Sequence, residues 1–153
     1  MSVTDFSCVL TSAEETEVLA EKIAGFCKVG DILLLYGDLG VGKTTFARSF
    51  IQSLAATKEE IVSPTFTLVQ TYPLRKGGEV WHCDLYRLKN EAELIELGLE
   101  EAFGQNIMLI EWPEIAENYL PAGRLEIKLE MAGTGRRVTV SGNDEIVGKI
   151  SKI

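Results

Sequence analysis

The chain is poor in the side chains that build metal centres and nucleophile triads. His82 is its only histidine, and its three cysteines, Cys8, Cys27 and Cys83, are widely spaced with no C-x-x-C pair. A zinc site of histidine and cysteine, or a triad of serine, histidine and aspartate, would therefore lack most of its members. The odd number of cysteines predicts free, mostly buried thiols in a reducing compartment.

Long apolar runs and an excess of basic residues are also missing. No run approaches the roughly 18 apolar residues of a membrane-spanning helix, and the first residues do not join a basic region to an apolar one. We therefore expect a soluble cytoplasmic protein with no membrane partner. Lys and Arg number 15 against 23 Asp and Glu, a net charge of −8. That charge disfavours unaided binding to RNA, so we expect a partner to hold any RNA involved.

The size of the chain suits a single domain. Its 153 residues, 46% of them hydrophobic and 25% charged, are typical of one globular unit with one core. No internal repeat or low-complexity linker divides it, so we expect one domain over residues 1–153. The last dozen residues are expected to be frayed, as chain ends often are.

Residues 37–44 read Gly-Asp-Leu-Gly-Val-Gly-Lys-Thr, a complete G-x-x-x-x-G-K-[ST] motif. The apolar run 31–36 before it predicts a strand buried on both faces of a parallel sheet. After it, apolar residues recur at helical spacing, so we expect a helix that ends near residue 56. A strand before and a helix after favour a phosphate-binding loop over a glycine-rich turn with a capping threonine.

The residue types of this motif suit a polyphosphate. Its glycines let the backbone turn several N–H groups inward, and the helix N-terminus adds a positive dipole end. Lys43 is predicted to reach the β and γ phosphates, and the Thr44 hydroxyl to take one coordination position of Mg²⁺. The predicted nucleotide-binding residues of the loop are Gly37, Asp38, Leu39, Gly40, Val41, Gly42, Lys43, Thr44 and Thr45.

The rest of the chain predicts an α/β fold, a P-loop NTPase-like domain whose mixed central sheet is flanked by helices and includes antiparallel hairpins. Helix caps, turn residues and hydrophobic periodicity delimit the elements. Before the glycine-rich motif we expect an edge strand at 6–10 and a helix capped by Thr11 or Ser12. After the loop helix, the segment 61–72 begins as a loop around Pro64 and turns into a strand, followed by a turn at 75–78 and a returning strand at 79–86. The last predicted elements are a helix from Asn90 to Gly98, a buried strand at 107–111 and a terminal hairpin of 124–131 and 136–141.

Two carboxylates stand at predicted strand ends, where parallel sheets place their ligand sites. A phosphoryl-transfer site needs such groups to hold Mg²⁺ and to position the nucleophile. Glu111 is expected to be the metal-side acid, and Asp84 to orient water or the metal. Each has a structural alternative. Glu111 would otherwise cap a helix that begins near Pro113, and Asp84 would otherwise pair with Arg87.

Two further features stay open between a functional and a structural role. Trp112, beside Glu111, either covers the site, responds to a partner or belongs to the core. Ser63, Pro64 and Thr65 follow the loop helix, where nucleotide switches carry a hydroxyl that senses the γ-phosphate, and Thr65 is the candidate. A turn with capped hydroxyls is the equal alternative. No Asn-Lys-x-Asp motif is present, which favours adenine over guanine.

Four blocks in series resemble the TsaE (YjeE) family over roughly residues 10–140: Gly-Asp-Leu-Gly-Val-Gly-Lys-Thr-Thr, Ser-Pro-Thr-Phe-Thr-Leu, His-Cys-Asp-Leu-Tyr-Arg-Leu and Ile-Glu-Trp-Pro-Glu. The resemblance implies a bacterial ATPase of tRNA threonylcarbamoyladenosine (t6A) biosynthesis that uses ATP and Mg²⁺. It also implies work with TsaB and TsaD on adenosine 37 of ANN-decoding tRNAs, with tRNA reached indirectly through that complex. Hydrolysis would be slow alone and would reset the complex between rounds.

The resemblance also assigns roles to residues. It implies that Lys43 and Thr44 bind phosphate and Mg²⁺, that Glu111 is the second metal-side acid and that Asp84 serves catalysis. Trp112 and the 63–67 loop would respond to partners.

The same resemblance suggests that Thr11 and Arg136 flank the adenine. Two rival functions remain at this point. One is a nucleotide-dependent binding switch without required hydrolysis, and the other is a small-molecule kinase, for which only Arg136 and Arg137 suggest a lid.

Overall fold

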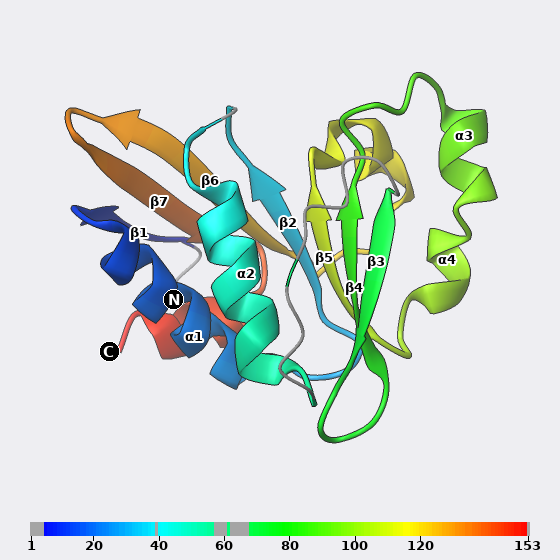
Figure 1. Ribbon diagram of the computed structural model, residues 1–153, viewed down its shortest axis with the longest axis horizontal. Coiled ribbons are helices and arrows are strands. Elements are labelled where there is room, and N and C mark those ends of the chain that lie inside the picture. Colours follow the sequence, from blue (N-terminus) through cyan, green and yellow to red (C-terminus); the bar gives the residue numbers. More distant parts are fainter. Residues whose placement is uncertain (1–4, 39, 57–60, 62–67, 153) are drawn as a thin grey trace.

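One mixed sheet organises the molecule (Figure 1). The computed structural model describes residues 5–38, 40–56, 61 and 68–152. Within these ranges, the sheet has seven strands in the order β1-β7-β6-β2-β5-β4-β3. The strands are β1 (Asp5–Leu10), β2 (Ile32–Tyr36), β3 (Val69–Pro73), β4 (Glu79–Asp84), β5 (Ile107–Glu111), β6 (Leu125–Ala132) and β7 (Gly135–Ser141). The helices are α1 (Ala13–Phe26), α2 (Lys43–Leu54), α3 (Glu91–Glu96), α4 (Leu99–Ala102), the 3₁₀ helix η1 (Pro113–Tyr119) and α5 (Asp144–Ile150).

The centre of the sheet is parallel and its margins are antiparallel. Strand β2 pairs in parallel with β5 and β6, and β4 pairs in parallel with β5. The hairpins β3–β4 and β6–β7 are antiparallel, and β1 joins the sheet by pairing antiparallel with β7. This arrangement confirms the predicted mixed sheet, with β1 as an edge strand.

Two hydrophobic cores lie on opposite faces of the sheet because β2 and β5 are apolar at successive positions, which point to alternate faces. Leu33 and Leu35 belong to the core under α1, α2 and α5, whereas Ile32 and Leu34 belong to the core under α3, α4 and η1. Because both faces of β2 are packed against a core, its end at Tyr36 gives the glycine-rich loop a fixed starting point. None of the helices in the described ranges combines the length and the apolar character that a membrane crossing requires.

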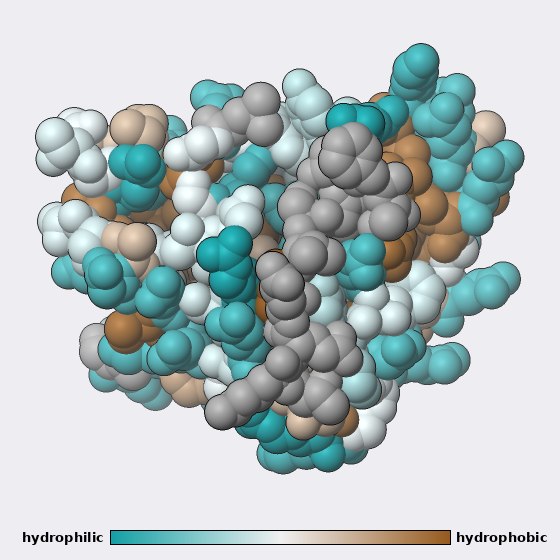
Figure 2. Space-filling view, in the orientation of Figure 1, coloured by the Kyte–Doolittle hydropathy of each residue, from teal (hydrophilic) through white to brown (hydrophobic). Residues whose placement is uncertain are grey.

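The surface is less uniform than this two-sided core. Figure 2 shows that apolar surface gathers beside α3 and α4, while hydrophilic and mixed residues cover much of the rest of the same face. Ile95 of α3 is 66% exposed, which makes it an unusually open aliphatic side chain.

Several local predictions are confirmed. The Ser12 side chain caps α1 by accepting from the Glu15 N–H, and Asn90 caps α3. A hydrogen bond from the Leu74 N–H to the Gly78 carbonyl closes the hairpin turn at 2.9 Å. Strand β4 ends at Asp84, two residues earlier than predicted, because the Asp84 side chain accepts from the N–H of Tyr86 at 3.0 Å and turns the chain.

The prediction that the last dozen residues are frayed is wrong. The side chain of Asn143 caps α5 by accepting from the N–H of Ile146 at 3.1 Å. Ile146, Val147 and Ile150 are all buried in the core that α1 covers. An asparagine cap followed by two acidic residues was the available sequence signal for this helix.

Candidate nucleotide-binding site

The glycine-rich loop joins β2 to α2, as predicted. Gly37 and Gly42 have left-handed φ angles of +148° and +110°. A Cβ added to Gly37 would lie 2.7 Å from Val41 Cγ1 and 2.8 Å from the carbonyl oxygen of Leu129, so only glycine fits there. The Phe46 N–H bonds to the Gly42 carbonyl at 3.0 Å, which leaves the earlier N–H groups of α2 at its open end. Such an end suits an anion.

Lys43 is the first residue of α2 and is buried, with 5% of its surface exposed. Its Nζ donates to the Gly37 carbonyl at 2.6 Å. Burial lowers the pKa of the Lys43 ammonium, and the nearby negative charges of Glu111 and Asp84, followed by those of Glu114 and Asp38, act in the opposite direction. The loop therefore has a buried cation facing a group of carboxylates.

Asp84 and Glu111 end adjacent parallel strands and are directly opposite each other in register. Each is 6% exposed. Two carboxylates so placed, close enough to Lys43 to act on its pKa, form the acidic side of the site. The alternative role predicted for Glu111 was to cap the helix near Pro113. In the described part of the chain, the N-cap of η1 is Trp112, and no side chain caps this helix. The Glu111 carboxylate contacts His82 instead. The capping alternative for Glu111 is therefore not observed.

Trp112 lies over the loop lysine. Its ring centre is 3.5 Å from Lys43 Nζ and 4.7 Å from the centre of the Tyr86 ring. Its φ of +54° is unusual for a bulky residue. Trp112 is half-buried and is not a member of either core cluster of the described residues. Of the alternatives that the sequence left open, a place in the core is therefore not observed, and the role of Trp112 beside the loop stays a prediction.

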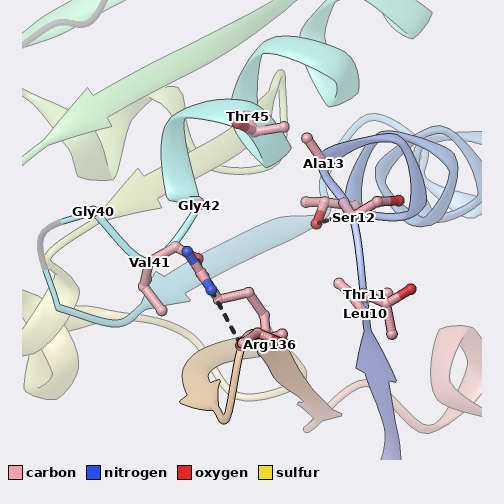
Figure 3. Close-up of a pocket in the computed structure, with 12 residues that line it drawn as sticks. Leu10, Thr11, Ser12, Ala13, Gly40, Val41, Gly42, Thr45 and Arg136 are labelled. Carbon is pink, nitrogen blue, oxygen red and sulfur yellow. Dashed lines mark hydrogen bonds between the residues drawn. The ribbon is translucent and has the colours of Figure 1, made fainter.

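A cavity of about 370 Å³ lies on the other side of the loop. Thr11 and Arg136 line it from the first and last parts of the chain, and Figure 3 shows the Arg136 side chain reaching toward Val41. Arg136 Nε donates to the Val41 carbonyl at 3.0 Å, which ties β7 to the loop. The lining consists of Leu10, Thr11, Ser12, Ala13, Thr16, Gly40, Val41, Gly42, Thr45, Thr134, Gly135 and Arg136. Its size is in the range of small-molecule sites.

The remaining predicted residues fall into two groups. Thr44 is exposed at the start of α2, beside Lys43. Leu39, Ser63, Pro64 and Thr65 lie outside the described residues, so their predicted roles stay predictions.

His82 was not among the predicted site residues, although its bond to Glu111 makes it part of the site. Its position two residues before Asp84 on a strand, hence on the same face, was the available signal. Over the described ranges, no three His, Cys, Asp or Glu side chains gather as a metal site. Mg²⁺ does not need such a cluster, because it commonly uses one or two carboxylates with phosphate and water. The donor set here fits that kind of site.

The fold and the loop define a class of protein, the α/β proteins that carry a phosphate-binding-loop motif between a central parallel strand and a helix. Within that class, a family model described as "Threonylcarbamoyl adenosine biosynthesis protein TsaE" matches residues 10–138. The chain therefore belongs to the TsaE family.

Individual relatives agree with this assignment. The chain is 44% identical over 138 residues to the tRNA threonylcarbamoyladenosine biosynthesis protein TsaE of Rickettsia bellii, covering 90% of this chain and 95% of that protein. It is 43% identical over 127 residues to the protein of the same name from Bacillus subtilis, covering 81% and 77%. The crystal structure of Bacillus subtilis YdiB superposes with a TM-score of 0.78 at 34% identity, covering 99% of this chain and 94% of that chain.

Proposed function

We propose that this chain is a Mg²⁺-dependent ATPase that supports t6A modification of adenosine 37 in ANN-decoding tRNAs by binding and resetting a TsaB–TsaD complex. Membership of the TsaE family supports the pathway. The single observation that best supports phosphate chemistry is the buried Lys43 ammonium, which contacts the glycine-rich loop and faces Glu111 and Asp84. A buried cation and paired acids beside a helix N-terminus are the parts that phosphoryl transfer requires.

Each part has a proposed role. The N–H groups of the loop and of the start of α2 bind the ATP phosphates, and Lys43 exchanges the Gly37 carbonyl for a phosphate oxygen. The Thr44 hydroxyl and Glu111 hold Mg²⁺, directly or through water, and Mg²⁺ supplies neutralisation of charge that develops on the phosphates. Asp84 orients the attacking water.

The cavity beside the loop is the proposed adenine site, with Thr11 and Arg136 at its walls. Trp112 is the proposed partner-responsive side chain, because it covers Lys43 and contacts the exposed Tyr86. Docking of TsaB and TsaD would then be sensed directly at the lysine. The loop 63–67 keeps its predicted switch role.

The charge distribution supports an indirect role for tRNA. Residues 90–123 contain eight glutamates and no lysine, arginine or histidine, while the rest of the chain has as many acidic as basic side chains. The whole net charge of −8 thus resides in one segment, which includes α3, α4 and η1. A polyanion would be repelled there, so tRNA is reached through the partners.

Phosphate release from ATP with Mg²⁺, measured for the chain alone and with a TsaB–TsaD pair, tests the proposal. We expect the pair to stimulate release. Glu111→Gln keeps ATP binding without Mg²⁺ within a few-fold, loses about tenfold or more of the affinity that Mg²⁺ adds, and loses roughly 100-fold or more of turnover, since several kcal/mol of charge stabilisation depend on the metal. Glu96→Gln, an exposed change of the same type, is the control.

The alternatives give different outcomes. Release at the wild-type rate from Glu111→Gln would sink the role of that residue. Complex formation without stimulation, unaffected by Glu111→Gln, favours a nucleotide-dependent binding switch. Transfer of the phosphate to an added small molecule favours a kinase.

A further inference from the structure

His82 and Glu111 form a buried pair behind the phosphate-binding loop. His82 Nε2 lies 2.7 Å from Glu111 Oε2, and the two residues are 2% and 6% exposed. In register, Glu111 is opposite Asp84, so its side chain reaches back along β4 to the residue two positions earlier. Both acids and the histidine therefore point to the same face of the sheet.

The direction of this hydrogen bond follows from the chemistry of the two groups. A carboxylate that holds a metal ion is ionised and only accepts hydrogen bonds, so in that role of Glu111 the Nε2–H group of His82 donates a hydrogen bond to Oε2. Among the described residues, a hydrogen bond to the Glu111 carboxylate comes from His82 and engages Oε2 rather than Oε1.

The other ring nitrogen makes a purely structural role unsatisfactory. Nδ1 of His82 is buried and has no hydrogen-bond partner among the described residues. A buried polar atom without a partner costs stability, and an apolar side chain at this place in the core would avoid that cost. The contact of Nε2 with Glu111 is therefore the feature of this histidine that an apolar side chain could not supply.

We propose that His82 is a positioning residue that fixes Glu111 Oε2 and so presents Oε1 to Mg²⁺; this inference rests on the proposed function of Glu111. A glutamate side chain has several rotatable bonds, and each must be frozen for it to hold a metal. A hydrogen-bond donor on the neighbouring strand restricts these bonds before the metal binds, which lowers the entropy cost of binding. Removing a residue that hydrogen-bonds to a metal ligand typically lowers metal affinity or activity by about 10- to 100-fold.

His82→Leu and His82→Gln test the proposal together. Leucine has no donor, whereas the glutamine amide can donate from nearly the position of Nε2. We expect His82→Leu to lose some thermal stability, because the buried Glu111 Oε2 loses its donor, and to bind ATP normally without Mg²⁺. Its gain in ATP affinity on adding Mg²⁺, and its kcat, should fall about tenfold, and its KM for ATP in Mg²⁺ should rise with the loss of affinity. His82→Gln should restore most of the affinity gain and of kcat.

Equal Mg²⁺ dependence and kcat in His82→Leu and wild type would overturn the inference, as would a His82→Gln variant as impaired as His82→Leu. Should His82→Leu fail to fold, His82→Asn, whose shorter amide does not reach Oε2, is measured alone and in the double variant His82→Asn, Glu111→Gln. Losses that simply add then overturn the proposal, and losses that do not add support it.

The failure of the proposed function is distinguishable. If Glu111→Gln itself leaves the Mg²⁺ dependence of ATP binding unchanged, Glu111 is not a metal-side acid, and both proposals fall. If Glu111→Gln loses Mg²⁺ dependence and turnover as expected but His82→Leu loses neither, only the role of His82 is overturned.

Discussion

The Lys43 ammonium lies 3.5 Å from the centre of the Trp112 ring while its Nζ donates to the Gly37 carbonyl at 2.6 Å. The lysine is thus held by a carbonyl of its own loop and covered by an aromatic face. A cation over an indole ring is worth about 0.5–2 kcal/mol. In the proposed binding mode a phosphate oxygen would replace these contacts, which would link occupancy of the loop to the environment of Trp112.

Replacing Lys43 with alanine should abolish most nucleotide binding. A hydrogen bond to a charged group contributes about 1.5–3 kcal/mol, so ATP affinity should fall roughly 10- to 100-fold. Equilibrium binding with labelled ATP measures this. Lys76→Ala, at an exposed position in the β3–β4 turn, should bind as wild type. Equal affinity of the two variants would contradict the assignment of Lys43.

Trp112 should report nucleotide binding through its fluorescence, because ATP draws Lys43 from beneath the ring. The chain has two tryptophans, so Trp81→Phe leaves Trp112 as the only emitter. We expect an ATP titration with Mg²⁺ to change the emission of Trp81→Phe and to leave that of Trp112→Phe nearly constant. The reverse pattern would show that the lysine and the ring are not linked.

Gly37 should not tolerate a side chain. Gly37→Ala forces a Cβ to within 2.8 Å of the Leu129 carbonyl oxygen at a φ of +148°, so the loop must shift. Stability should fall by about 1–3 kcal/mol, with a loss of ATP binding. Gly148→Ala, in α5 with nothing within 4 Å of its Cβ, should gain about 0.5–1 kcal/mol. Urea unfolding separates the two, and normal ATP binding by Gly37→Ala would refute the prediction.

Arg136 should contribute to ATP affinity through its bond to Val41 and its place in the cavity wall. Arg136→Ala removes a hydrogen bond of about 0.5–1.5 kcal/mol, so we expect a roughly three- to tenfold rise in Kd. Calorimetric titration of ATP provides the value. The neighbouring Arg137 is exposed and does not line the cavity, so Arg137→Ala is the matched control. Similar effects of both variants would point to net charge instead.

The parts of the fold that depend on local chemistry were predictable. A short continuous apolar run bounded by turn residues is typical of a strand covered on both faces, so β2 and β5 were recognised. The order of glycines and Lys43 identified the loop, and the strand-end position of Glu111 placed it beside Lys43. These features need no knowledge of how distant segments meet.

The parts that depend on register were not predictable. The contact of His82 with Glu111 requires that β4 pair with β5 in one particular alignment. The position of Trp112 over Lys43 requires a left-handed turn directly after β5. Helix α5 packs its apolar face against the core under α1. An amphipathic pattern of only seven residues is too short to predict that contact from the sequence.

The cavity beside the loop joins residues from opposite ends of the chain, with Thr11 on one wall and Arg136 on the other. During synthesis, the wall with Arg136 leaves the ribosome well after the wall with Thr11. A nascent chain therefore has no such cavity until the β6–β7 hairpin has emerged and paired with β1. If the cavity is the adenine site proposed above, nucleotide would not find it complete during early folding, and a copy truncated before residue 134 would lack one of its walls.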